Sequence, residues 1–267
     1  MSDSPAPVLV TGATGRLGRA VTTHLVTEGF SVRALSRGAR EPTGTIDWVA
    51  GDIATGTGLH QATSGVSAIV HLASAPYRRG YTREVEIGGT GRLLAAAANA
   101  GVEHVIYTSI IGCDKVPWGY IRTKWEAEKI VRNSAVPSSI LRLGQFHEFI
   151  DQGLTALART GLVTSDRGFV AQPVDTADAA GRILGMLREG PCDEIVEFGG
   201  PEVLDLRTAV EQWLEATGTR RPHLPIHVPG KLGRAIRNGL LATQAEPRGT
   251  RTWQDYLKSR YGRCAVG

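Results

Sequence analysis

Cysteine, long apolar runs and clusters of metal ligands are all scarce in this sequence of 267 residues. The three cysteines, Cys113, Cys192 and Cys264, lie far apart, and no two of them have the spacing of a metal site or a redox motif. We therefore expect three unpaired thiols in a reducing compartment and no bound metal. A chain of this length buries enough apolar surface to fold without disulfide bonds.

A transmembrane segment and a secretory signal are also missing from the pattern. His, Arg or Gly interrupts the longest apolar segments, so none approaches the ~20 uninterrupted apolar residues that cross a bilayer. The first seven residues contain no Lys or Arg of the kind that opens a signal peptide. These absences predict a cytoplasmic protein with no transmembrane segment.

The net charge of +4 is unevenly distributed. Between Arg220 and Arg263, ten Lys or Arg stand against two acids, so this segment carries +8 and the remainder −4. Such a segment attracts nucleic acid, anionic lipid or an anionic ligand, or is a solvated surface. Because Leu, Ile and Trp are interspersed, we favour the surface and expect no nucleic-acid partner. The amphipathic stretch 231–237 is predicted to pack over the substrate pocket, with contact to anionic lipid as the alternative.

Short β-branched runs alternate with helical patterns over the first two thirds of the chain, which is typical of a parallel sheet wound with helices. We predict an α/β fold with a Rossmann-type doubly wound parallel sheet over residues 1–144. A small, mainly helical substrate-binding portion over 145–267 is expected to pack on it as one compact unit. The predicted strands are 8–11, 31–36, 46–50, 68–72, 104–108 and 138–143, and the predicted helices are 16–28, 90–100, 120–133, 148–159, 176–188, 206–217, 230–241 and 252–261.

A glycine-rich turn stands between the first predicted strand and the first predicted helix. A dinucleotide loop needs one glycine for the tight turn, one for close approach of the pyrophosphate, and one for packing of the helix on the strand. The helix N-terminus then supplies N–H donors and partial positive charge. We therefore predict a cofactor-binding loop made by Gly12, Thr14, Gly15, Arg16, Leu17 and Gly18.

The end of the second strand decides between the two nicotinamide dinucleotides. An NAD-selective site has an acid there, whereas an NADP-selective site has an arginine for the 2′-phosphate. The segment Ala-Leu-Ser-Arg-Gly-Ala-Arg contains no acid, so Arg37, with Ser36 and Arg16, favours NADP(H) over NAD(H); an ordinary exposed arginine is the alternative. After the third strand, Asp52 and Ile53 are expected beside the adenine, unless Asp52 caps the next helix.

A second motif surrounds the end of the fifth strand. Tyr120 and Lys124 share one helix face, so the ammonium is expected to lower the phenol pKa from about 10. Ser109, at the strand end, is expected to hydrogen-bond the substrate oxygen. Together they predict a site in which the phenol protonates a carbonyl oxygen as hydride reaches its carbon. An ordinary surface Tyr–Lys pair is the alternative.

Three further polar residues lie near this predicted site. Gln145 and His147 stand where the chain leaves the sixth strand, beside the expected nicotinamide, and are predicted to contact the substrate. For His147, helix capping or packing is the alternative. His71 is expected to be packed and hydrogen-bonded rather than catalytic.

The chain resembles the short-chain dehydrogenase/reductase superfamily in its atypical, NmrA-like branch. The resemblance covers essentially the whole chain, and the glycine motif and the Tyr–Lys pair are its specific parts. It implies that Ala73 and Ser74 line the cofactor and that Ser109, Tyr120 and Lys124 are catalytic. The matching segments are 11–18, 51–52, 71–74, 107–109, 120–124, 141–147, 174–180 and 199–202.

These observations predict an NADP-dependent reductase of a small carbonyl, enone or quinone-like substrate. One alternative is a non-catalytic NADP(H)-binding redox sensor that acts through a partner, although a sensor has no need of both Tyr120 and Lys124. The other is an epimerase or dehydratase of nucleotide sugars, which shares the Tyr and Lys machinery. Against it, the C-terminal third shows no obvious site for a nucleoside diphosphate.

Overall fold

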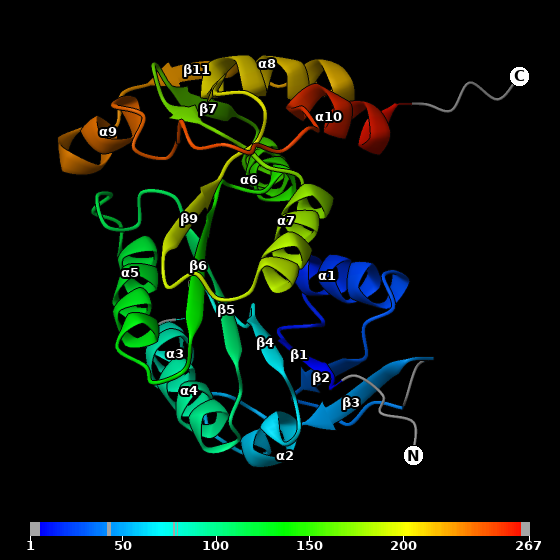
Figure 1. Cartoon of the computed structure of the whole chain (residues 1–267). Helices are drawn as coiled ribbons and strands as arrows, with labels where there is room; N and C mark the ends of the chain where they lie inside the picture. The colour runs from blue at the N-terminus through cyan, green and yellow to red at the C-terminus, as the bar shows by residue number, and fades with distance from the viewer. Residues whose placement is uncertain (1–5, 42–43, 77, 79, 263–267) are drawn as a thin grey trace, which may run out of the picture. The chain divides into compact units, whose positions relative to one another are not determined.

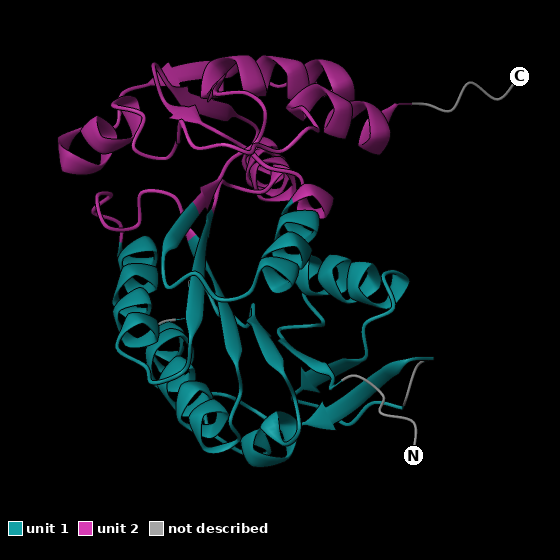
Figure 2. Ribbon diagram, viewed as in Figure 1, with its two compact units in different colours: residues 1–109, 119–142, 179–196 teal, residues 110–118, 143–178, 197–267 magenta. Residues whose placement is uncertain are grey.

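The computed structural model describes residues 6–41, 44–76, 78 and 80–262 (Figure 1). The chain forms two compact units, coloured separately in Figure 2. Unit 1 comprises Met1–Ser109, Gly119–Arg142 and Ala179–Val196, and unit 2 comprises Ile110–Trp118, Leu143–Asp178 and Glu197–Gly267. The chain thus leaves unit 1 three times, after Ser109, Arg142 and Val196. The predicted roles of the two portions stay predictions.

Within the described residues, seven strands form one central sheet in the order β3-β2-β1-β4-β5-β6-β9. The strands from β3 to β5 pair in parallel. Backbone hydrogen bonds join Ile140 to Glu194 and Gly144 to Phe198 at a constant offset, so β9 also runs parallel to β6. This order confirms the predicted Rossmann-type fold. The bounds are β1 Val8–Thr11, β2 Val32–Ser36, β3 Ile46–Ala50, β4 Ala68–His71, β5 His104–Ile110, β6 Ser138–Leu143 and β9 Ile195–Phe198.

Helices cover both faces of this sheet, with α1 and α7 on one face and α4 and α5 on the other (Figure 1). An ion pair of 2.5 Å joins Glu28, at the end of α1, to Arg188 of α7. Before α4, the chain forms one turn of π-helix, η1. The bounds are α1 Arg16–Thr27, α2 Leu59–Thr63, α3 Tyr81–Arg83, η1 Glu84–Gly89, α4 Thr90–Asn99, α5 Gly119–Arg132 and α7 Thr176–Glu189.

The core of unit 1 lies between the sheet and its helices. Every residue of β1, β4 and β6 is buried, as expected for parallel strands covered on both faces. Leu9, Ile69 and Ile140 of these strands belong to the same core as Leu93 of α4 and Val131 of α5. Each such side chain contributes about 1.5–3 kcal/mol by leaving water, and together they hold the strand ends in fixed positions.

Among its described residues, unit 2 contains two small sheets, the helices that pack beside them and the first turn of α7. Strand β7 (Val163–Asp166) pairs in parallel with β11 (His223–Ile226), and β8 (Val170–Ala171) pairs antiparallel with β10 (Leu204–Asp205). The β7–β11 pairing was not predicted. The helices are α6 His147–Arg159, α8 Leu206–Thr217, α9 Gly230–Arg237 and α10 Trp253–Tyr261.

A buried carboxylate organises the interior of unit 2. Asp151 of α6 accepts hydrogen bonds from Trp213 Nε1 at 2.7 Å, Tyr256 Oη at 2.8 Å and Tyr261 Oη at 2.6 Å. Because these donors come from α8 and α10, the carboxylate joins three helices. It is therefore a packing centre for unit 2.

In the described part of the chain, no helix is long and apolar enough to span a bilayer, and no group of three His, Cys, Asp or Glu is suited to hold a metal. Cys113 is buried and Cys192 is exposed, and they form no disulfide. Cys264 lies outside the described residues.

Candidate active site

A cleft of about 370 Å³ opens in unit 1 beyond the carboxyl ends of β1, β2, β3 and β4. This is where ligands bind in open parallel sheets. Nine of the predicted cofactor residues line it: Gly12, Thr14, Gly15, Ser36, Arg37, Asp52, Ile53, Ala73 and Ser74. Arg16 and Leu17 instead begin α1 beside the cleft, and Gly18 lies buried beneath it.

The glycine loop leaves room that a side chain would fill. Gly12 has a φ of +67°, and a Cβ there would lie 2.7 Å from the Ala73 nitrogen. A Cβ on Gly18 would lie 2.1 Å from the Gly12 oxygen, so Gly18 permits the close approach of α1 to this turn. Among the described residues, no side chain caps the N-terminus of α1. Its N–H groups and the space at Gly12 suit a pyrophosphate.

One end of the cleft is rich in arginine. Arg37 donates to the Tyr81 hydroxyl at 3.4 Å, and Arg40 donates to Ser36 Oγ at 3.2 Å. Arg78 and Tyr81, which follow β4, also line the cleft. Sequence reasoning missed these two residues because no motif marks the segment that carries them.

Asp52 begins a tight turn that follows β3. Its carboxylate accepts from the Ala54 N–H at 2.9 Å, and its own N–H donates to the Thr57 oxygen at 2.9 Å. It therefore closes a local turn rather than capping α2, which begins only at Leu59. The same residue lines the cleft, so the turn holds it in place for a ligand.

One residue that lines the cleft contacts the predicted proton donor. Tyr120, on the first turn of α5, has its Oη 2.8 Å from Ser74 Oγ, and Ser74 lines the cleft. Lys124 follows one helical turn later, and Ser109 lies buried near the end of β5. All four residues belong to unit 1.

Glu86 joins this group and was not predicted. Its carboxylate accepts from Ser74 Oγ, from Lys124 Nζ at 3.2 Å and from Tyr107 Oη at 3.5 Å. The ion pair is almost completely buried, with side-chain exposures of 5% for Lys124 and 0% for Glu86. Nothing in the sequence distinguishes Glu86 from Glu84, which lies exposed two residues earlier.

The position of Lys124 changes the expected electrostatics of the phenol. Its Nζ lies 4.3 Å from the centre of the Tyr107 ring. Burial lowers the pKa of Lys124, but Glu86 and Tyr107 together outweigh burial, so the pKa is raised. Burial, followed by the charge of Glu86, raises the pKa of Tyr120 above its ordinary value. We had expected Lys124 to lower that pKa. The structure differs because the ammonium is paired with Glu86.

His71 lies behind this group and is packed and hydrogen-bonded, as expected. Its Nδ1 lies 2.7 Å from Thr11 Oγ1 and its Nε2 lies 3.0 Å from Thr90 Oγ1. Thr90 donates its own proton to the Glu86 carbonyl at 2.6 Å, so it accepts from His71. Burial, with a smaller effect of Lys124, lowers the pKa of His71 to about 3. His71 is therefore neutral.

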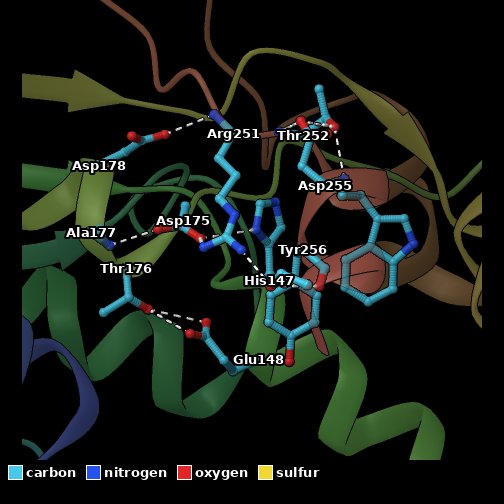
Figure 3. A network of polar contacts seen from close by, with 12 residues as sticks. His147, Glu148, Asp175, Thr176, Ala177, Asp178, Arg251, Thr252, Asp255 and Tyr256 are labelled. Atoms are coloured by element: carbon cyan, nitrogen blue, oxygen red, sulfur yellow. Dashed lines mark hydrogen bonds and ion pairs between the residues drawn. The ribbon is translucent and has the colours of Figure 1, made fainter. Parts of the chain in front are cut away.

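The predicted substrate residues lie in unit 2. His147 is fully buried, with ring centroids 5.8 Å from Trp253 and 5.4 Å from Tyr256 (Figure 3). Its Nδ1 lies 3.9 Å from Asp175, which accepts from Arg251 at 3.1 Å. This position favours the packing alternative. Gln145, two residues earlier, is half-buried, and the substrate role of both residues stays a prediction.

The basic stretch 231–237 forms α9 in unit 2. It buries Gly233, Ala235 and Ile236, so its apolar side faces the interior of the unit. Arg237 is paired with Asp166 at 2.8 Å. Its apolar side is therefore not displayed to a lipid surface.

Comparison with known proteins places the chain in a family. Residues 12–189 match the model of a family described as NAD(P)H-binding. A putative dihydroflavonol 4-reductase from Synechocystis is 37% identical over 38% of this chain and 32% of its own length. The photosystem II assembly factor Ycf39 of Cyanophora paradoxa is 30% identical over 65% of this chain and 56% of its own. The aligned regions thus span less than two thirds of either relative.

A solved structure has the same fold. The NADPH-dependent quinone oxidoreductase QOR2 of Escherichia coli, in complex with NADPH, superposes with a TM-score of 0.77 at 20% identity. The match covers 95% of this chain and 99% of that protein. The chain belongs to the family described as NAD(P)H-binding, whose model matches two thirds of its residues.

Proposed function

We propose that this chain is an NADPH-dependent reductase of a small carbonyl, enone or quinone-like substrate. The observation that carries the proposal is the double role of Ser74, which lines the cleft and lies 2.8 Å from the Tyr120 hydroxyl. The phenol therefore borders the space suited to a dinucleotide. The reductase named among the relatives and the NADPH bound by the fold neighbour agree with this assignment.

The residues of the cleft divide among the parts of the cofactor. NADPH supplies the hydride when bound. Arg37 and the newly found Arg78 offer two guanidinium groups for a 2′-phosphate, which supports NADP(H) over NAD(H). The remaining contacts that we propose are the pyrophosphate with Gly12, Thr14, Gly15 and the start of α1, the adenine with Asp52 and Ile53, and the nicotinamide end with Ala73 and Ser74.

Tyr120 is the proton donor in this proposal. A phenol is protonated at neutral pH, and burial and Glu86 raise the pKa of Tyr120 further, so Tyr120 has a proton to give to the substrate oxygen. Ser109 orients that oxygen. Lys124 balances the buried charge of Glu86. These steps use only neutral hydroxyl groups at the reacting oxygen.

Turnover by a Tyr120→Phe variant tests this function. Wild-type protein is expected to oxidise NADPH with members of a panel of ketones, enones and quinones. Tyr120→Phe is expected to lose most of this turnover, at least about a hundredfold, and to keep its affinity for NADPH. Tyr261→Phe is the control, because that hydroxyl is bonded to Asp151 in unit 2. Equal turnover by both variants would remove Tyr120 from the mechanism.

A second candidate function is a non-catalytic NADP(H)-binding protein that acts through a partner. It is favoured by the relative named as an assembly factor, which is 30% identical over 65% of this chain. It predicts tight NADPH binding, no turnover with any member of the panel, and a partner affinity that changes with the redox state of the cofactor. The turnover assay above therefore separates the two functions.

A further inference from the structure

Glu86 lies on the turn of π-helix and points into the interior of unit 1. η1 carries two acids, and they face opposite ways: Glu84 is exposed and pairs with Arg92 at 2.7 Å, whereas Glu86 has no exposed surface. A single π turn within a helix is frequently found at a functional site. Burial of an ionised carboxylate is costly unless charges and hydrogen bonds compensate it. The partners of Glu86 therefore show what it does.

Those partners fix the direction of a chain of hydroxyl groups. An ionised carboxylate only accepts hydrogen bonds, so the single proton of Ser74 Oγ is donated to Glu86. Ser74 must then accept in its 2.8 Å contact with Tyr120, and the phenol is the donor. The order Tyr120 to Ser74 to Glu86 requires a protonated phenol. A phenolate at Tyr120 would face the oxygen lone pairs of Ser74.

The surrounding charges support the same state. Lys124 neutralises Glu86 but lies against Tyr107, and burial raises the pKa of both Tyr107 and Tyr120. His71, which is also buried in unit 1, is neutral. Among these described groups, Lys124 is the cation, and Glu86 holds it.

We propose that Glu86 is a positioning residue for the reaction put forward above, on which this inference rests. Through Ser74, Glu86 keeps the Tyr120 phenol protonated and oriented before the substrate is reduced. In that reaction the substrate carbon takes the hydride from NADPH, and the substrate oxygen takes the proton of Tyr120. The phenolate left behind recovers one proton from water. Glu86 acts through Ser74 and touches no reacting atom.

Titration of the phenol tests the proposal without cofactor or turnover. The ultraviolet absorbance of phenolate is followed with pH in each protein and in the same protein carrying Tyr120→Phe, and the difference reports Tyr120 alone. In the wild type no difference is expected below about pH 10. In Glu86→Gln, the amide can donate to Ser74, which then donates to Tyr120. The phenolate should therefore appear at least about one pH unit lower.

Matched variants separate positioning from folding. Glu84→Gln removes the neighbouring exposed acid and is expected to titrate as the wild type does. Ser74→Ala keeps the Glu86–Lys124 ion pair and removes the hydroxyl that joins Glu86 to the phenol, so it should shift the titration in the same direction by a smaller amount. It serves where Glu86→Gln leaves Lys124 too poorly compensated to fold. Glu86→Asp is expected to restore part of the wild-type behaviour.

The kinetic result distinguishes this inference from the function on which it rests. Glu86→Gln should move the alkaline fall of kcat for reduction to lower pH by the same amount as the phenol titration, and leave the KM for NADPH unchanged. An unshifted phenol in folded Glu86→Gln and Ser74→Ala would overturn the role of Glu86, even if the wild type turned over. A shifted phenol in a protein without turnover would instead overturn the reductase and the reaction that Glu86 is proposed to serve.

Discussion

Two buried ion pairs stand one helical turn apart on α5, and they are built differently. Lys124 pairs with Glu86, and Glu128 pairs with Arg142 of β6. Arg142 donates Nε to one carboxylate oxygen of Glu128 at 2.9 Å and Nη2 to the other at 2.7 Å. Glu86 instead shares its two oxygens among an ammonium and two hydroxyl groups.

The difference shows how the choice of cation separates structure from function. A guanidinium matches both oxygens of a carboxylate at once, so the Arg142 pair fastens α5 to the sheet. An ammonium is a point charge that leaves an oxygen of Glu86 available to Ser74. That oxygen connects the pair to the cleft through Tyr120. We therefore assign the Glu128–Arg142 pair to stability and the Lys124–Glu86 pair to the proposed chemistry.

Removal of Arg142 should have the largest effect on stability. Arg142→Met takes two charge-assisted hydrogen bonds from a buried carboxylate, and we expect it to lower the free energy of unfolding by about 3–5 kcal/mol. Denaturant unfolding measures the loss. The double variant Arg142→Met with Glu128→Leu should recover much of it, because both buried charges are then absent. NADPH affinity of the folded variant should not change, and a loss of affinity would refute the division between the two pairs.

A smaller effect is expected at a residue of the cleft that belongs to neither pair. Arg37→Ala should weaken NADPH binding about tenfold, or about 1.4 kcal/mol, and leave NADH binding unchanged, because only NADPH carries the 2′-phosphate. Calorimetry with both dinucleotides measures this, with Arg19→Ala on the exposed side of α1 as the control. Equal weakening for both dinucleotides would assign Arg37 to general electrostatics instead of cofactor choice.

Local patterns in the sequence predicted the sheet and the cofactor loop. The first six strands of the central sheet lie within two residues of their expected bounds, because β-branched runs separated by helical periodicity are a short-range signal. The glycine loop is equally local, since a side chain at any of its glycines would lie too close to the backbone of the turn or of the segment after β4. Tyr120 and Lys124 were placed on one helix for the same reason.

Contacts between distant segments were beyond such patterns. Lys124 and Glu86 are 38 residues apart, and the pattern of the sequence does not show which of Glu84 and Glu86 is buried. The expected effect of Lys124 on Tyr120 failed because its partner was unknown. The β7–β11 sheet was missed because each strand has four residues and β11 contains Pro225.

The central claim is that the turn after β1 holds a nicotinamide dinucleotide, and calorimetric titration with NADPH tests it most directly. A Cβ at Gly12 would lie 2.7 Å from backbone, whereas one at Gly153 of α6 meets nothing within 4 Å among the described residues. We predict that the wild type and Gly153→Ala each bind one NADPH per chain and that Gly12→Ala binds none detectably. Folded wild-type protein that takes up neither NADPH nor NADH would contradict the account.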